Sequence, residues 1–169
     1  EIDGAHTLFL KGYETIFRSN IKDVIARYFE LTRQMVSEAC PTIIGHLDKI
    51  KMQNIDNTLF HEQDSWYQQE IKTTLETIKA SDAIIEVNTR GIYQKKSSTT
   101  YPSPWVLELI HQKKIPITLS SDAHHPDDIV NQFQETARML KTIGFNTLTI
   151  LHHGIWKAFT FTDHGIIIR

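Results

Sequence analysis

The sequence lacks the features that mark secreted, membrane-spanning and nucleic-acid-binding proteins. Cys40 is the only cysteine, so no internal disulfide can form, and a reducing cytoplasm is the simplest inference. No apolar run approaches the roughly 20 residues that a membrane span needs, and no signal-peptide pattern opens the sequence. The net charge is −2, which provides no broad positive field for nucleic acid or an anionic membrane. We therefore expect a cytoplasmic protein that binds neither nucleic acid nor a membrane.

Several common active-site motifs are also absent. The sequence contains no G-x-G-x-x-G, no G-x-x-x-x-G-K-[ST] and no G-x-S-x-G, so nucleotide binding of those kinds and a nucleophile elbow are unsupported. The hydrophobic content of 40% and the charged content of 22% are typical of a globular protein. With 169 residues, the chain is long enough for a real core, and we expect a single domain over residues 1–169.

The densest group of hydrogen-bonding and titratable residues follows an apolar run. Residues 115–119 predict a short buried strand that ends in Ser-Ser-Asp-Ala-His-His, and Pro126 then begins a helix. Asp122 and His124 are two positions apart, so both could reach one point from the same strand end. A carboxylate with a neutral imidazole suits zinc, manganese or iron. An ordinary polar loop with a capping aspartate is the alternative interpretation.

Two further predicted strands also end in polar residues. Residues 42–48 predict a buried strand with His46 near its C-terminal end, although a histidine satisfied inside the core would give the same pattern. Residues 83–88 predict the next strand, which Glu86 interrupts. A buried carboxylate is costly unless it is paired or hydrogen-bonded, so Glu86 is either a structural partner or part of a site.

Helical patterns alternate with these strands. A helix capped by Ser19 or Asn20 is expected to reach Ala39, with its periodic apolar residues, including Met35, in the core. Strand–helix alternation favours a parallel sheet or a piece of a (β/α) barrel. The remaining expected loops are an irregular one over 1–18, a polar one over 52–63 and a basic one over 93–104. Further helices are expected over 64–80, 103–112 and 126–143, the last with a break near Gln132 and a cap at Gly144. A strand over 146–151 and a terminal hairpin formed by 159–161 and 166–168 complete the expected segments.

Three motifs in this order resemble one known family. They are Gly45-His46-Leu47-Asp48, Glu86-Val87-Asn88-Thr89-Arg90-Gly91 and Ser121-Asp122-Ala123-His124. Together they resemble the polymerase and histidinol phosphatase (PHP) superfamily, and within it the branch of PHP-type histidinol phosphatases.

The resemblance implies a distorted seven-stranded, TIM-like (β/α) barrel with two or three divalent metal ions, zinc, manganese or iron. It implies hydrolysis of L-histidinol phosphate, a small phosphate ester, to L-histidinol and phosphate in histidine biosynthesis. Carried over by position, the metal ligands are His46, Asp122 and His124, with Asp122 and His124 also catalytic. The residues implied in substrate binding are Glu86, Asn88, Arg90, Lys49 and Lys51. Tyr93 stands where some relatives carry an arginine.

One motif of the family is missing. Its members begin with His-x-His on their first strand, whereas this chain has no His-x-His and begins with Glu1. The resemblance therefore implies the C-terminal portion of a barrel, which we expect to be inactive alone. Its open sheet edges would need a homo-oligomer or the missing N-terminal half to cover them. The alternatives are a PHP-type phosphoesterase with another substrate and a vestigial, non-catalytic module.

Overall fold

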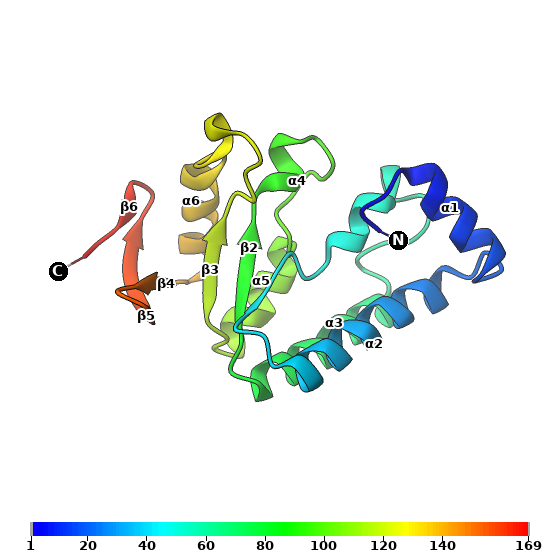
Figure 1. The fold of residues 1–169 in the computed structure, drawn as a ribbon, viewed down its shortest axis with the longest axis horizontal. Coiled ribbons are helices and arrows are strands. Elements are labelled where there is room, and N and C mark those ends of the chain that lie inside the picture. Colours follow the sequence, from blue (N-terminus) through cyan, green and yellow to red (C-terminus); the bar gives the residue numbers. More distant parts are fainter. Residues whose placement is uncertain (1, 169) are drawn as a thin grey trace. The chain divides into compact units, whose positions relative to one another are not determined.

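The chain divides into two compact units, which are described one at a time. The computed structural model describes residues 2–168, and Figure 1 gives the element labels used below. The first unit runs to Cys40 and continues over Lys49–Ser81, while the second contains Pro41–Asp48 and the chain from Asp82 onward. The single domain that the length suggests stays a prediction.

Two long helices form the body of the first unit. Helix α2 covers Ile21–Ala39, and the side chain of Asn20 caps it by accepting a hydrogen bond from the backbone N–H of Lys22 at 3.1 Å. Helix α3 covers Ser65–Ala80, with Asp64 at its N-cap. Both helices begin and end within one residue of the predicted positions, because capping residues and the helical period are local signals.

Aromatic rings pack between these two helices. The rings of Phe29 and Tyr67 meet edge to face at 6.0 Å, and Phe60 stacks on Tyr67 at 4.9 Å. All three side chains are buried. The apolar stripe of α2 is narrower than predicted, since Leu31 and Met35 are 46% and 44% exposed. The prediction that Met35 lies in the core is therefore wrong.

The first eighteen residues are not the irregular loop that the sequence predicts. Helix α1 covers His6–Thr15, although its N-cap, Ala5, makes no side-chain cap and only Phe9 is buried. Tertiary contacts fix the start of this helix, because Gln53 Oε1 accepts a hydrogen bond from His6 Nδ1 at 3.0 Å and Gln53 Nε2 donates to the carbonyl of Ile2 at 2.6 Å. The predicted 52–63 loop contains the end of one short 3-10 turn, η1 (Lys49–Gln53), and the whole of a second, η2 (Ile55–Asn57).

A parallel three-stranded sheet forms the centre of the second unit. Its order is β1 (Ile43–Ile44), β2 (Ile84–Asn88) and β3 (Ile117–Ser120). Ile43 pairs with Ile84, and Glu86 pairs with Thr118. The predicted parallel sheet is confirmed. Strand β1 is shorter than predicted, because the chain leaves the sheet directly after Ile44.

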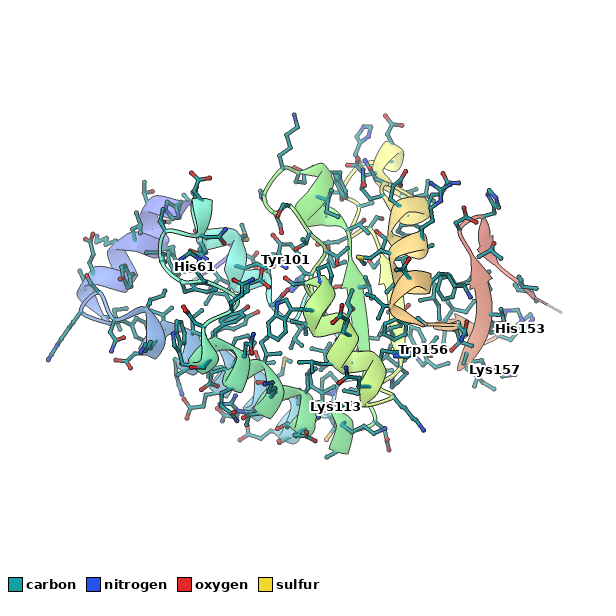
Figure 2. The ribbon with its side chains drawn as sticks, turned by 180° about the vertical axis from the view of Figure 1, so that it is seen from behind. His61, Tyr101, Lys113, His153, Trp156 and Lys157 are labelled. Carbon is teal, nitrogen blue, oxygen red and sulfur yellow. The ribbon has the colours of Figure 1, made fainter. Side chains whose placement is uncertain are left out.

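Helices connect and cover these strands. The short α4 (Arg90–Tyr93) follows β2 directly, and α5 (Pro104–Gln112) and α6 (Phe133–Ile143) lie on the face of the sheet that is turned forward in Figure 2. The predicted break near Gln132 is confirmed by its φ of 65°, and Gly144 ends α6 at a φ of 115°. A 3-10 turn, η3 (Pro126–Asp128), stands where the predicted helix begins.

The C-terminal strands form a separate antiparallel sheet. It contains β4 (Thr147–His152), β5 (Ile155–Thr162) and β6 (Gly165–Ile166), in that order. The predicted terminal hairpin is confirmed by the pairing of β5 with β6. The β4–β5 hairpin was not predicted. Its turn carries His153 and Gly154 at positive φ, and Figure 2 shows His153 there beside the strand that bears Trp156.

The molecule is therefore of the mixed α/β class, with helices packed on parallel strands. The described part of the chain, residues 2–168, contains no helix with the length and apolarity of a membrane span.

Replacing Phe29 tests the core of the first unit. We expect Phe29→Ala to lower the free energy of unfolding by about 3–5 kcal/mol, because it removes a fully buried ring and leaves a cavity. Leu31→Ala on the exposed side of the same helix should cost less than about 1 kcal/mol. Denaturant unfolding followed by circular dichroism measures both, and equal losses would contradict this description of the core.

An ion pair between α6 and the terminal hairpin should make the stability of the fold depend on pH. Arg138 Nε donates to Asp163 Oδ2 at 3.0 Å, and this hydrogen bond lowers the pKa of the Asp163 carboxyl. A lowered pKa stabilises the fold above the ordinary aspartate pKa, and the contribution is lost as the pH falls through the folded-state pKa. Arg138→Met should raise the pKa of Asp163, as measured by carboxyl NMR titration. Arg27→Met, which breaks the separate ion pair with Glu30, should leave it unchanged. An unmoved Asp163 titration in Arg138→Met would refute the assignment.

Candidate active site at the strand ends

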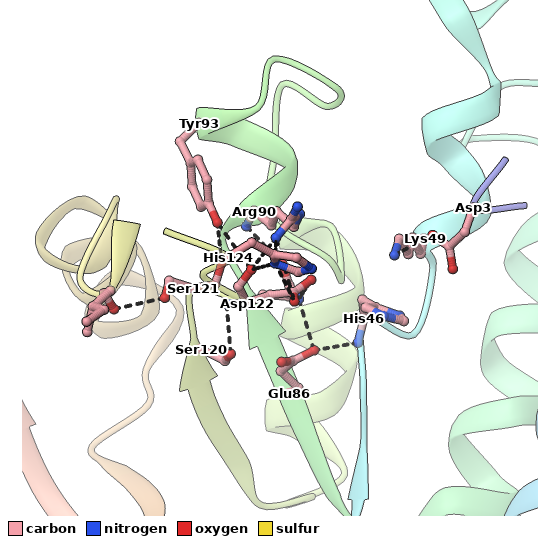
Figure 3. A network of polar contacts seen from close by, with 12 residues as sticks. Asp3, His46, Lys49, Glu86, Arg90, Tyr93, Ser120, Ser121, Asp122 and His124 are labelled. Atoms are coloured by element: carbon pink, nitrogen blue, oxygen red, sulfur yellow. Dashed lines mark hydrogen bonds and ion pairs between the residues drawn. The ribbon is translucent and has the colours of Figure 1, made fainter. Parts of the chain in front are cut away.

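The carboxyl ends of the three parallel strands meet at one polar cluster (Figure 3). Glu86 on β2 accepts a hydrogen bond from the backbone N–H of His46, which follows β1, with a distance of 2.8 Å from nitrogen to Oε2. His46 has a φ of 27°, a left-handed conformation that side-chain-bearing residues rarely adopt. The cluster thus begins where β1 leaves the sheet.

Asn88, at the end of β2, connects Glu86 to the next strand. Its Nδ2 lies 3.1 Å from Glu86 Oε2 and 3.3 Å from Asp122 Oδ2, and its Oδ1 accepts from the backbone N–H of Arg90 at 2.9 Å. The side chain is only 1% exposed. A continuous chain of hydrogen bonds therefore runs from His46 through Glu86 and Asn88 to Asp122.

Asp122 is held from several sides. Its backbone has a φ of 51°, and its N–H donates to Ser120 Oγ at 3.1 Å. Arg90 Nη1 donates to the Asp122 carbonyl at 2.5 Å and lies 3.9 Å from its carboxylate. His124 Nδ1 lies 3.8 Å from Asp122 Oδ1 and also contacts the Arg90 guanidinium. The structure therefore brings Asp122, His124 and Arg90 together.

Hydroxyl groups fix the loop that carries these residues. Tyr93 donates to the carbonyl of Ser121 at 2.8 Å, and burial raises the pKa of the Tyr93 hydroxyl, so it stays protonated as a donor. Ser121 Oγ donates to the carbonyl of Ile129 at 2.8 Å. Thr89 Oγ1 donates to the carbonyl of Asn131 at the same distance. Sequence reasoning did not assign Thr89 or Ser121 this role. Their position directly after a predicted strand was the available signal.

The two lysines predicted to bind phosphate belong to the first unit. Lys49 Nζ pairs with Asp3 Oδ1 at 2.5 Å, and Lys51 is buried in η1. Their predicted role toward a phosphate therefore stays a prediction, as does that of Arg90. The Arg90 side chain is 23% exposed, and a guanidinium of this kind is suited to bind two phosphate oxygens.

The predicted metal ligands form an incomplete set in this structure. Within residues 2–168, no three His, Cys, Asp or Glu side chains gather closely enough to hold a metal ion. Asp122 and His124 supply the ligand types that zinc, manganese and iron accept, but as a pair they fall short of the three protein ligands of a typical catalytic zinc site. The described residues therefore do not by themselves fit a complete metal centre.

Known proteins resemble this chain over different lengths. A "probable histidinol-phosphatase" of Schizosaccharomyces pombe is 24% identical over 156 residues, which are 90% of this chain and 50% of the relative. A second "probable histidinol-phosphatase", from Deinococcus radiodurans, is 27% identical over 78 residues, 46% of this chain and 30% of the relative. No family model matches the sequence. The chain thus spans half or less of the length of these curated relatives.

A solved structure supports the fold. The crystal structure of a protein from Listeria monocytogenes assigned as a histidinol phosphatase aligns with a TM-score of 0.56 at 21% identity, over 64% of this chain and 42% of that one. At this identity the match bears on the fold alone, and it agrees with an α/β arrangement. The resemblance recognised from the three motifs is confirmed in these comparisons: this chain is similar to proteins named as histidinol phosphatases.

Proposed function

We propose that this chain is part of a phosphomonoesterase that hydrolyses L-histidinol phosphate to L-histidinol and phosphate. The observation that carries the proposal is the chain of hydrogen bonds from His46 to Asp122, beside Arg90 and His124. It gathers the residues of all three family motifs at one edge of a sheet. The names of both curated relatives agree with this activity.

The chain's own residues have distinct roles in the proposed reaction. Arg90 binds phosphate oxygens and offsets the charge that increases on them as water attacks phosphorus. Asp122 accepts a proton from the attacking water, because its carboxylate lies 3.9 Å from the Arg90 guanidinium that binds the phosphate. Tyr93 and Ser120 hold Asp122 in place through its carbonyl and N–H groups.

The proposal includes a larger fold and divalent metal ions. Three parallel strands would form part of a distorted (β/α)7 barrel. The cluster contains the carboxylates of Glu86 and Asp122 and only one guanidinium, so its excess negative charge favours a cation. We propose His46, Asp122 and His124 as ligands to zinc, manganese or iron, two or three ions in the complete site. Further ligands have to come from outside the described residues.

A second candidate function is a non-catalytic module. The absence of a three-ligand group within residues 2–168 favours it for the chain by itself. A PHP-type phosphoesterase acting on another ester is a variant of the first proposal. A small phosphate ester as partner, association as a homo-oligomer or with a further N-terminal half, and a cytoplasmic location all stay predictions.

Phosphate release tests the proposed activity. We expect L-histidinol phosphate, with manganese or zinc added, to be hydrolysed by the protein extended upstream of Glu1, and not by the 169-residue chain alone. A phosphate assay with the intact mass recorded distinguishes the two. Turnover by a species of 19.6 kDa would contradict the need for further ligands. Absence of turnover by both would support the non-catalytic module.

Substitution of Asp122 tests its proposed role in the active form. Asp122→Ala should lower kcat on the order of 10²-fold or more, because it removes the proposed base. Asp127→Ala is the matched control, since its side chain lies on the following turn and is 90% exposed. Asp127→Ala should leave kcat unchanged. Equal activity of the two variants would exclude Asp122 from the reaction.

A further inference from the structure

We infer that Glu86 and Asn88 are positioning residues, which align His46 and Asp122 and do not contact the substrate. The inference rests on the proposed function, because it gives these two residues a role in the same site. The family resemblance implies substrate binding for both residues. The contacts of their side chains point to a different use.

The first contact concerns His46. Its positive φ of 27° is a strained backbone conformation, and such conformations persist only where the surrounding structure holds them. The N–H of His46 has left the strand ladder, and Glu86 Oε2 accepts it at 2.8 Å. A hydrogen bond to a carboxylate is stronger than one to a neutral acceptor. Glu86 therefore fixes the direction in which the His46 side chain leaves β1.

The second contact concerns the orientation of the Asn88 amide. Its nitrogen faces a carboxylate oxygen on each side, from Glu86 and from Asp122, while its oxygen accepts the N–H of Arg90. A flipped amide would place oxygen against two carboxylates and nitrogen against an N–H group, so only one orientation satisfies all partners. Asn88 therefore separates two negative charges and aligns the carboxylate of Asp122.

Burial and charge argue against substrate contact. Asn88 is 1% exposed, and both of its polar atoms have protein partners. Glu86 carries a negative charge, which would repel a phosphate group at short range. The same Glu86 oxygen already accepts from His46 and Asn88. Glu86 and Asn88 are thus placed to hold His46 and Asp122 in position without contacting the phosphate ester themselves.

Amide hydrogen exchange tests the contact with His46 without any assay of activity. In Glu86→Ala the His46 N–H should exchange faster by about tenfold or more, the loss expected for one charge-assisted hydrogen bond. Glu86→Gln keeps an acceptor oxygen and should restore slow exchange. The N–H of Ile85, which donates to the Pro116 carbonyl at 2.9 Å, is the internal control in the same sheet. Unchanged His46 exchange in folded Glu86→Ala would overturn the inference.

Kinetics of the active form separate positioning from substrate binding. Glu86→Ala should lower kcat by about tenfold or more with KM nearly unchanged, and Glu86→Gln should restore kcat. A rise in KM with kcat unchanged would overturn the inference, since it indicates lost substrate contact. If the wild type hydrolyses nothing while His46 exchange responds as expected, the positioning contacts stand and the proposed function fails.

Asn88→Ala provides a second test if Glu86→Ala does not fold. It removes the acceptor of the Arg90 N–H, which lies 2.9 Å from Asn88 Oδ1. The Arg90 amide should then exchange faster, while the His46 amide stays slow because Glu86 remains. An unchanged exchange rate of the Arg90 amide in Asn88→Ala would refute the positioning role of Asn88.

Discussion

The hydrogen bonds made by Glu86 and Asn88 are the constraint on which the candidate site depends. Strand β1 contains only Ile43 and Ile44, so the backbone N–H of His46 has no partner in the ladder. A polar backbone group that is removed from water needs another acceptor, and the Glu86 carboxylate supplies it. Asn88 then extends the connection to Asp122. Two side chains of the central strand, Glu86 and Asn88, thus connect the ends of the three strands by hydrogen bonds.

The alternation of side chains along β2 explains how one strand serves both core and site. Ile85 and Val87 are fully buried on one face, while Glu86 and Asn88 point to the other face. The apolar face fixes the register of the strand, because a shift of one residue would place carboxylate and amide in the core. The same packing that stabilises the sheet therefore sets the distances within the polar cluster.

The second unit arranges the site residues with the help of its connecting segments. Hydroxyl groups of Thr89 and Ser121 bind carbonyls of the segment after η3, and Tyr93 binds the carbonyl of Ser121. These bonds fix the loop that bears Asp122. The proposed phosphatase activity depends on these strands and loops to hold the site residues in place. It also needs metal ligands beyond the described residues, in which no group of three His, Cys, Asp or Glu side chains could hold a metal ion.

The sequence by itself determined the features that depend on local signals. The cap at Asn20, the helix end at Gly144, the parallel sheet and the three strand-end motifs all follow from residue type and spacing. Tertiary structure decided the rest. Helix α1 depends on contacts with the distant Gln53, and β4 pairs with β5 instead of continuing the parallel sheet. The two interpretations of Glu86 looked alike in sequence, because its partners lie at the ends of other strands, which only folding brings within hydrogen-bonding distance.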